Sequence, residues 1–296
     1  MSKELKGIIM LFVTAFIWGT AFTAQSAGME YIGPFTFNCV RSFLGGLVLI
    51  PIMAGFKAFD RQNIKTDISL KNTVIGGICC GTVLFAASAL QQCGIAQTTA
   101  GKAGFITALY IVLVPLAEYF IYKKASKRIW LCVLIAMCGF YLLCIKEDLG
   151  IGRGDMLVLV CAFCFTVHIM VIDVFNGRNT DGMLMSCIQF FTAGVYSAVF
   201  MLAKENVSAA AVARAWLPLA YAGIMSSGVA YTLQILGQRR TSPAKATLIM
   251  SLESVFAAAA GAIILGEKMQ PREMLGCVLV FAAVIIAQIR PTSAEK

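Results

Sequence analysis

The sequence predicts an all-α integral membrane protein, with ten transmembrane helices arranged as two inverted five-helix repeats around a central cavity. Of the 296 residues, 59% are hydrophobic and only 13% are charged, which is too apolar for a surface that faces water. The apolar residues gather in ten runs, each long enough to cross a bilayer. The sequence of residues 90–115 in the first half also recurs, with substitutions, as residues 233–258 in the second half.

The ten apolar runs each approach the length of about 20 residues that a hydrocarbon core of about 30 Å requires. Glycine and proline lie inside several of them, which transmembrane helices tolerate. The short segments between the runs leave no soluble domain. The predicted helices cover residues 7–28, 35–56, 73–92, 101–122, 129–145, 155–174, 183–203, 213–236, 243–265 and 273–290.

The first run begins like a signal peptide, because Lys3 and Lys6 precede an apolar stretch. That stretch is longer than a signal peptide allows, and no small-residue cleavage pattern follows it. Ala15-Phe16 also has a counterpart in Ala162-Phe163, at the same relative place of the second half. We therefore expect residues 7–28 to be a helix of the mature protein.

The distribution of Lys and Arg predicts the orientation of the chain. With a cytoplasmic N-terminus, 16 of the 24 basic residues fall in inner segments and 6 in outer ones, while Arg41 and Lys102 fall in neither. The positive-inside rule therefore places both termini in the cytoplasm, with the chain in the cytoplasmic membrane. The formal charge of +9 then needs no nucleic-acid partner. The six outer residues are Lys146, Arg153, Lys204, Arg214, Lys268 and Arg272.

The internal repeat has an offset of 143 residues. Residues 90–115 and 233–258 are identical at nine of 26 positions. Five helices per half is an odd number, so the second half must enter the membrane inverted. The loop of Ala96 and Gln97 is then outside, and that of Arg239 and Arg240 inside. Inverted repeats are typical of secondary transporters that bind substrate near the membrane midplane. We divide the chain into a first repeat, 1–146, and a second, 147–296.

Several segments resemble an EamA-type member of the drug/metabolite transporter superfamily. The resemblance implies ten helices in two repeats around a central cavity, and export of small metabolites. One departure is Ser254, where many relatives carry proline, so we expect a softer break in that helix. The segments are AFIWGTAF at 15–22, GFITALYIVLVPL at 104–116, the stretch 230–268 that contains SLESVFAAAAGAIILGEK, and GCVLVFAAVIIA at 276–287.

Three stripes of polar and aromatic residues predict which helix faces line the cavity. From these stripes we predict Trp18, Gln91, Tyr231 and Gln234 as substrate-binding residues. The alternative is hydrogen bonding between helices, worth about 0.6–2 kcal/mol per contact. The stripes comprise Thr14, Trp18, Phe22 and Gln25 in 7–28, Ser88 and Gln91 in 73–92, and Tyr231, Gln234 and Gln238 in 213–236.

Glu253 lies about ten residues into the run 243–265, which at about 1.5 Å per residue puts it near the midplane. A carboxylate there is costly unless it is paired, hydrated or protonated. Its repeat partner is Tyr110. We predict that Glu253 faces the cavity and binds a substrate amine or carries a coupling proton, with Tyr110 hydrogen-bonded nearby. The alternative is that Glu253 mainly holds its helix against its neighbours.

His168, the single histidine, lies midway along the run 155–174. We include it among the predicted substrate-binding residues, since ionisable groups inside membranes usually face a cavity. The alternative is a hydrogen bond between helices. With Cys161 and Cys164 it occupies one helix face and suggests a soft-metal site, but no second helix offers partner ligands. We therefore predict no metal and no cofactor.

Three basic residues lie in or beside the apolar runs. Lys102 and Lys245 open two equivalent helices, where the positive end of the helix dipole disfavours a cation. They are gate candidates that capture an anionic substrate group, with lipid phosphate as the alternative partner. For Arg41 we expect a structural role, in an internal salt bridge or by snorkelling toward the interface.

Enzyme motifs are missing from the sequence: it carries no HExxH, GxSxG, Walker A or dinucleotide-binding pattern in a suitable context. We therefore expect a secondary transporter that exports small metabolites, such as amino acids or amphipathic amines, by alternating access. The alternative is a membrane receptor or scaffold without transport activity. The expected partners are a small-molecule substrate and the lipid bilayer, with protons considered as the coupling ion and a homodimer as the assembly.

Overall fold

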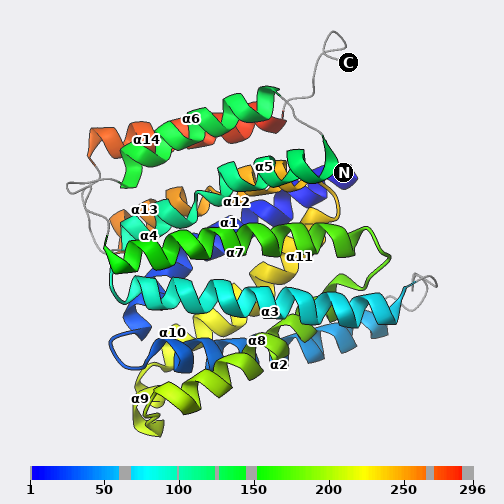
Figure 1. Cartoon of the computed structure of the whole chain (residues 1–296), viewed down its shortest axis with the longest axis vertical. Coiled ribbons are helices and arrows are strands. Elements are labelled where there is room, and N and C mark those ends of the chain that lie inside the picture. Colours follow the sequence, from blue (N-terminus) through cyan, green and yellow to red (C-terminus); the bar gives the residue numbers. More distant parts are fainter. Residues whose placement is uncertain are drawn as a thin grey trace.

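The computed structural model describes residues 2–59, 68–98, 100–123, 127–144, 152–264 and 270–288. Over these residues the regular structure is helical and contains no strand, so the all-α prediction is confirmed for them. The helices lie side by side as a stack of roughly parallel rods (Figure 1). Six of the described helices are long and apolar enough to cross a membrane. The ten-span topology goes beyond these six and stays a prediction.

The helices begin and end within a few residues of the predicted runs. Serine and aspartate side chains accept hydrogen bonds from free backbone N–H groups where several of them start, as Ser69 does for α3 and Asp181 for α8. The helices are α1 (Lys3–Gly28), α2 (Pro34–Phe59), α3 (Leu70–Ile95), α4 (Ala100–Thr107), α5 (Tyr110–Tyr122), α6 (Lys127–Cys144), α7 (Arg153–Asn176), α8 (Gly182–Lys204), α9 (Ala209–Arg214), α10 (Trp216–Ala220), η1 (Tyr221–Tyr231), α11 (Thr232–Gln238), α12 (Pro243–Met250), α13 (Glu253–Ile264) and α14 (Pro271–Gln288).

Two of the predicted helices are each interrupted by one tight turn. The first breaks between α4 and α5, where the N–H of Ile111 donates to the carbonyl of Ala108 at 3.0 Å. The second breaks between α12 and α13, where the N–H of Ser254 donates to the carbonyl of Ser251 at 3.3 Å. Both bonds span three residues instead of four, which tightens the chain. The second break is therefore present without a proline at position 254.

One stretch of the chain is wound as a π-helix, η1, which continues directly into α11. Its carbonyl groups accept hydrogen bonds from the neighbouring helix α1: Thr14 Oγ1 donates to Ala230 at 3.0 Å, and Trp18 Nε1 donates to Ser226 at 3.4 Å. π-Helical turns are frequent at functional sites. These two side-chain hydrogen bonds join α1 to the backbone of η1.

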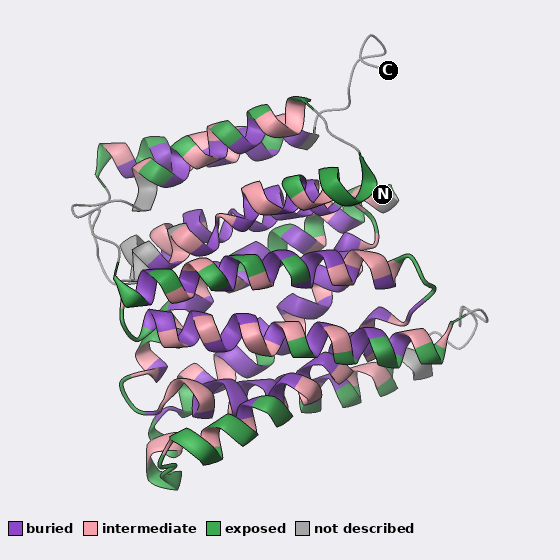
Figure 2. Ribbon diagram, viewed as in Figure 1, coloured by how far each residue is buried: buried purple, intermediate pink, exposed green. Residues whose placement is uncertain are grey.

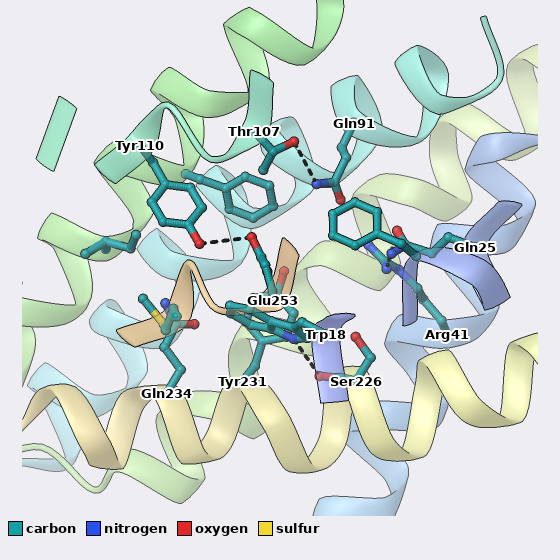
Figure 3. Close-up of a pocket in the computed structure, with 14 residues that line it drawn as sticks. Trp18, Gln25, Arg41, Gln91, Thr107, Tyr110, Ser226, Tyr231, Gln234 and Glu253 are labelled. Carbon is teal, nitrogen blue, oxygen red and sulfur yellow. Dashed lines mark hydrogen bonds between the residues drawn. The ribbon is translucent and has the colours of Figure 1, made fainter. Parts of the chain in front are cut away.

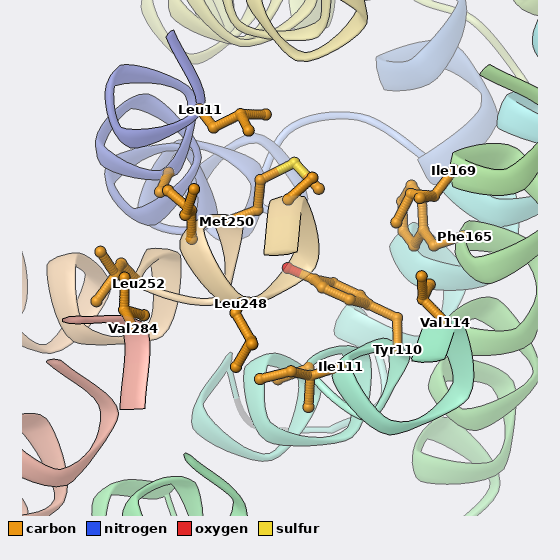
Figure 4. Close-up of a cluster of buried hydrophobic side chains, with 14 of the residues drawn as sticks. Leu11, Tyr110, Ile111, Val114, Phe165, Ile169, Leu248, Met250, Leu252 and Val284 are labelled. Atoms are coloured by element: carbon orange, nitrogen blue, oxygen red, sulfur yellow. The ribbon is translucent and has the colours of Figure 1, made fainter. Parts of the chain in front are cut away.

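The core lies between the helices and combines residues from both halves of the chain. Buried residues line the faces that the helices turn toward each other, while exposed residues follow the outer faces (Figure 2). Many of the outer residues are large and apolar, such as Phe120, Leu134 and Leu202, whose side chains are 63%, 64% and 77% exposed. A water-soluble protein would not present such a surface, and lipid is the medium that covers it. Figure 4 shows the main apolar cluster, to which Leu11, Tyr110 and Met250 belong.

Candidate functional site

A pocket lies between helices of both halves of the chain (Figure 3). Its cavity is about 40 Å³, which is room for a few water molecules and far less than a metabolite needs. The helices around it must separate before a metabolite can enter. The lining residues are Trp18, Phe22, Gln25, Arg41, Gln91, Thr107, Tyr110, Phe165, Ile169, Ser226, Tyr231, Gln234, Met250 and Glu253.

The structure brings together all but one of the residues that the sequence predicts as substrate-binding. Those that line the pocket are Trp18, Gln91, Tyr110, Tyr231, Gln234 and Glu253. Their arrangement in one pocket is a geometric finding, and their role toward a substrate stays a prediction.

His168 is the predicted residue that does not line the pocket. Its side chain is fully buried, and Nε2 lies 3.1 Å from Oε1 of Gln189, which joins α7 to α8. The ring lies 6.0 Å from that of Tyr231, so His168 stands behind the pocket wall. This geometry matches the alternative role considered for His168, which was a hydrogen bond between helices. Among the described residues, no group of three or more histidines, cysteines or carboxylates is placed to hold a metal.

Glu253 and Tyr110 form a hydrogen-bonded pair inside the pocket. The Tyr110 hydroxyl donates to Oε1 of Glu253 at 2.9 Å (Figure 3). Both side chains are 4% exposed, and each residue opens the helix that follows an interruption, α5 and α13. Buried carboxyl groups need such partners, because an unpaired charge away from water is costly. The contact agrees with the expectation that Tyr110 is hydrogen-bonded near Glu253.

Aromatic rings form one wall of the pocket. The ring centroids of Trp18 and Tyr231 are 4.6 Å apart, and Phe190 packs edge-on against Tyr231 at 5.5 Å. The wall is held in place because the Trp18 indole is hydrogen-bonded to η1. Such rigid rings suit the apolar part of a ligand.

Amide side chains supply the remaining polar surface. Nε2 of Gln91 donates to Oγ1 of Thr107 at 3.4 Å, which joins α3 to α4. Gln234 is 2% exposed and its Oε1 has no hydrogen-bond partner within the described part of the chain. A buried polar atom without a partner costs free energy, so this carbonyl oxygen is available to a ligand donor.

Arg41 is a pocket residue that the sequence analysis assigned to a structural role. Its side chain is 5% exposed, so it does not snorkel to the interface. It makes no ion pair with any residue that the structure describes. Nη1 donates to Oε1 of Gln25 at 3.3 Å, and the guanidinium lies 5.9 Å from the centre of the Phe37 ring. Like Glu253, Arg41 is an ionisable group inside an apolar run, which is the sequence signal for a pocket residue.

Of the two gate candidates, Lys245 does not line the pocket. Lys245 pairs with Glu4 of α1, with Nζ 3.3 Å from Oε1, and both side chains are partly exposed. The carboxylate of Glu4 therefore balances the charge of Lys245, in place of the lipid phosphate that was the alternative partner. An exposed ion pair of this kind contributes about 0–1 kcal/mol to stability. Lys102 belongs to α4, but its side chain lies outside the described residues. The gate role of both lysines stays a prediction.

A bundle of apolar helices around a polar, aromatic-lined pocket is typical of membrane carriers for small molecules. The model of the EamA-like transporter family matches this chain twice, over residues 5–145 and 152–288. The chain therefore belongs to the EamA-like transporter family, as its resemblance suggested. The family is one of transporters and not of enzymes, and it makes the chain a multi-pass membrane protein.

Curated relatives match nearly the whole chain. An uncharacterized transporter of Archaeoglobus fulgidus is 31% identical, and the match covers 97% of this chain and 87% of the relative. A transporter of Chlamydia trachomatis, named for S-adenosylmethionine and S-adenosylhomocysteine, is 24% identical over 93% of this chain and 88% of its own length. A solved crystal structure matches with a TM-score of 0.77 at 16% identity, covering 95% of this chain and 96% of that chain, which establishes a shared fold.

Proposed function

We propose that this protein is a secondary transporter that exports small metabolites, such as amino acids or amphipathic amines, across the cytoplasmic membrane by alternating access. The Glu253–Tyr110 hydrogen bond carries the proposal, because it joins repeat-equivalent positions of the two halves inside the pocket. In this proposal residues 1–146 and 147–296 form two inverted five-helix repeats, and both termini lie in the cytoplasm.

The symmetry of the interruptions supports the inverted repeat. The helices that precede the breaks end at Thr107 and Met250, and those that follow begin at Tyr110 and Glu253. Both pairs differ by the same 143 residues as the repeated sequence. The helix contacts agree, since α7 packs against α3 and α5 while α1 packs against α11 and α13. Interrupted helices near the midplane are a common way for transporters to bring polar groups to a substrate.

The small size of the pocket supports alternating access. A cavity of about 40 Å³ admits water but no metabolite, so a transport cycle requires states in which the helices separate. The sequence carries no Walker A pattern, so a substrate or ion gradient must drive the cycle. Protons are the coupling ion that a pocket carboxyl group such as Glu253 can carry.

The chlamydial relative bears on the substrate class. Both molecules in its name carry an α-amino acid group, and S-adenosylmethionine also carries a positively charged sulfonium group. Amino acids and amphipathic amines therefore form the substrate panel that the proposal tests first.

The test is counterflow exchange in proteoliposomes that contain the purified protein, with labelled amino acids and amphipathic amines presented in turn. We expect exchange of at least one member of the panel at a rate well above that of protein-free liposomes. Liposomes with the protein unfolded by heat are the matched control. If no member exchanges, the proposal fails, and a receptor or scaffold role explains the fold better.

The inverted topology predicts opposite accessibility for two equivalent loops. A cysteine introduced at Gln97 is expected to react with a membrane-impermeant thiol reagent from outside the cell, while one at Thr241 reacts only from the cytoplasm. The starting variant lacks reactive native cysteines. Labelling of both positions from the same side would contradict the inverted repeat.

A further inference from the structure

Two parts of the structure make the same contact at opposite ends of the helices. The start of α1 packs on the turn between α11 and α12, and the start of α7 packs on the turn between α3 and α4. In Figure 1, α1 begins at the end of the stack where the N-terminus lies, and α7 begins at the opposite end. We call the contact of residues 4–11 with 237–245 the α1 closure, and that of residues 94–98 with 152–158 the α7 closure.

The α1 closure depends on two glycines that bring the chain segments into direct contact. A Cβ atom built on Gly7 lies 2.8 Å from Cβ of Arg240 and 3.1 Å from the carbonyl oxygen of Gly237. One built on Gly237 lies 3.2 Å from the carbonyl oxygen of Gly7. The ion pair of Glu4 with Lys245, at 3.3 Å, joins the same two segments. The contact therefore leaves no room for a side chain at Gly7.

The α7 closure has the same construction. A Cβ atom built on Gly154 lies 2.9 Å from the carbonyl carbon of Gln97, and one built on Gly94 lies 3.0 Å from the carbonyl oxygen of Gly154. A polar contact again joins the two segments, because Oγ1 of Thr98 donates to Oδ1 of Asp155 at 2.5 Å. Here too the contact leaves no room for a side chain at the glycine that begins the helix.

The two closures use equivalent residues of the internal repeat. The 143-residue offset of the turns pairs Gly94 with Gly237. The helix starts are offset by 147 residues, which pairs Gly7 with Gly154 and also separates Ala15-Phe16 from its counterpart. The close contact is therefore made twice, once by each half of the repeat.

Each closure lies about one helical turn from the pocket. Gly237 follows the pocket residue Gln234 by three residues, and Gly94 follows the pocket residue Gln91 by three, which is about 4.5 Å along a helix. Both closures are made in this structure. The cavity of about 40 Å³ between them agrees with a pocket that is shut toward both ends.

We propose that the two closures are the gates of the carrier, and that the α1 closure separates when the pocket opens to the cytoplasm and the α7 closure when it opens to the outside. The inference rests on the proposed function, which supplies alternating access and the orientation of the chain. Glycine at each contact lets the segments touch and separate without interlocking side chains. Lys245 then holds the inner gate shut through Glu4.

The test measures from which side a thiol reagent reaches the pocket. Ser226 lines the pocket, so Ser226→Cys in a background without reactive native cysteines supplies the probe. Its rate of labelling by a membrane-impermeant methanethiosulfonate is measured in right-side-out and in inside-out membrane vesicles. The ratio of the two rates reports the balance between the two open states. Gly55→Ala is the matched control, because a Cβ at Gly55 meets nothing within 4 Å.

Gly7→Ala and Gly154→Ala are expected to shift this ratio in opposite directions. The added methyl group clashes only while its closure is made. Gly7→Ala should therefore favour labelling from the cytoplasm, and Gly154→Ala labelling from the outside, each by at least about fivefold. The double variant should return the ratio toward the wild-type value. Unchanged ratios in both folded variants would show that the closures stay made throughout the cycle and would overturn the proposal.

Two further variants weaken the closures without overpacking them. Glu4→Gln removes the ion pair and should raise labelling from the cytoplasm by up to about fivefold, since an exposed pair contributes little. Thr98→Val removes the donor to Asp155 and should raise labelling from the outside. Added salt screens the ion pair, so it should raise cytoplasmic labelling in the wild type and not in Glu4→Gln. A shift in the same direction for both variants would overturn the proposal.

Labelling and counterflow exchange separate this inference from the proposed function. Opposite shifts of the ratio without exchange of any amino acid or amine would overturn the proposed export and leave the two gates. Exchange with unchanged ratios would overturn the gates and leave the transporter. Labelling from the outside in Gly7→Ala would overturn the cytoplasmic placement of the termini, and with it the side assigned to each gate.

Discussion

Glu253→Gln is expected to abolish the part of substrate uptake that a pH gradient drives, and to lower net uptake at least about tenfold. The glutamine has nearly the same shape, and its carbonyl oxygen can still accept the hydrogen bond of Tyr110. It can neither release a proton nor balance the charge of an amine, and a hydrogen bond to a charged group contributes about 1.5–3 kcal/mol. The measurement is uptake into proteoliposomes with and without an imposed pH gradient, together with counterflow exchange.

The two assays separate the roles of Glu253. Loss of the pH dependence with exchange retained assigns proton coupling, whereas loss of both in a folded protein assigns binding of the substrate amine. Tyr110→Phe is the matched control, because it deletes the hydrogen bond at 2.9 Å and keeps the ring. Its effect on transport should be smaller, because the carboxyl group of Glu253 remains. Wild-type behaviour of Glu253→Gln in both assays would leave Glu253 as a structural residue.

Gly19→Ala is expected to destabilise the protein and to reduce transport, because α1 approaches α13 at this glycine. A Cβ atom built on Gly19 lies 2.5 Å from the carbonyl oxygen of Glu253 and 2.9 Å from the nitrogen of Ala257. Backbone atoms cannot rotate away as a flexible side chain can, so the two helices must separate. Overpacking of this kind costs about 1–3 kcal/mol. The shift also displaces Glu253 in the pocket.

The stability change is measured as the midpoint of thermal unfolding in detergent or nanodiscs, and transport by counterflow exchange. Gly55→Ala is the matched control, because a Cβ at Gly55 of α2 meets nothing within 4 Å. It should leave the unfolding midpoint unchanged or slightly higher, since alanine favours the helix over glycine. An equal midpoint for Gly19→Ala and wild type would show that the α1–α13 contact relaxes without cost.

The helices themselves are predictable from composition, because a run of about 20 apolar residues can satisfy its backbone in a membrane only as a helix. The predicted runs and the observed helices agree to within a few residues. The 143-residue offset pairs Glu253 with Tyr110, and the expected hydrogen bond between them is present, with the Tyr110 hydroxyl 2.9 Å from Oε1 of Glu253. The break expected near Ser254 is present, at the turn of Ser251 and Leu252, and its softness stays a prediction.

For Arg41 and His168, the sequence did not show which of the two residues lines the pocket. Both are ionisable groups within apolar runs, and the sequence analysis assigned Arg41 a structural role and His168 a binding role. In the structure Arg41 lines the pocket, while His168 bonds to Gln189 behind its wall. Each helix is largely apolar on all sides, so periodicity along the chain does not distinguish the face that meets the pocket from the face that meets another helix.

The sequence by itself determined that the chain is a bundle of membrane helices with an internal repeat, since lipid imposes length and polarity on every spanning segment separately. The tertiary structure alone decided that Arg41 lines the pocket without an ionic partner among the described residues, and that His168 lies behind the pocket wall. It also decided that Lys245 meets Glu4, 241 residues earlier in the chain. Such contacts depend on the rotation and separation of packed helices, and packing between surfaces distant in sequence sets both.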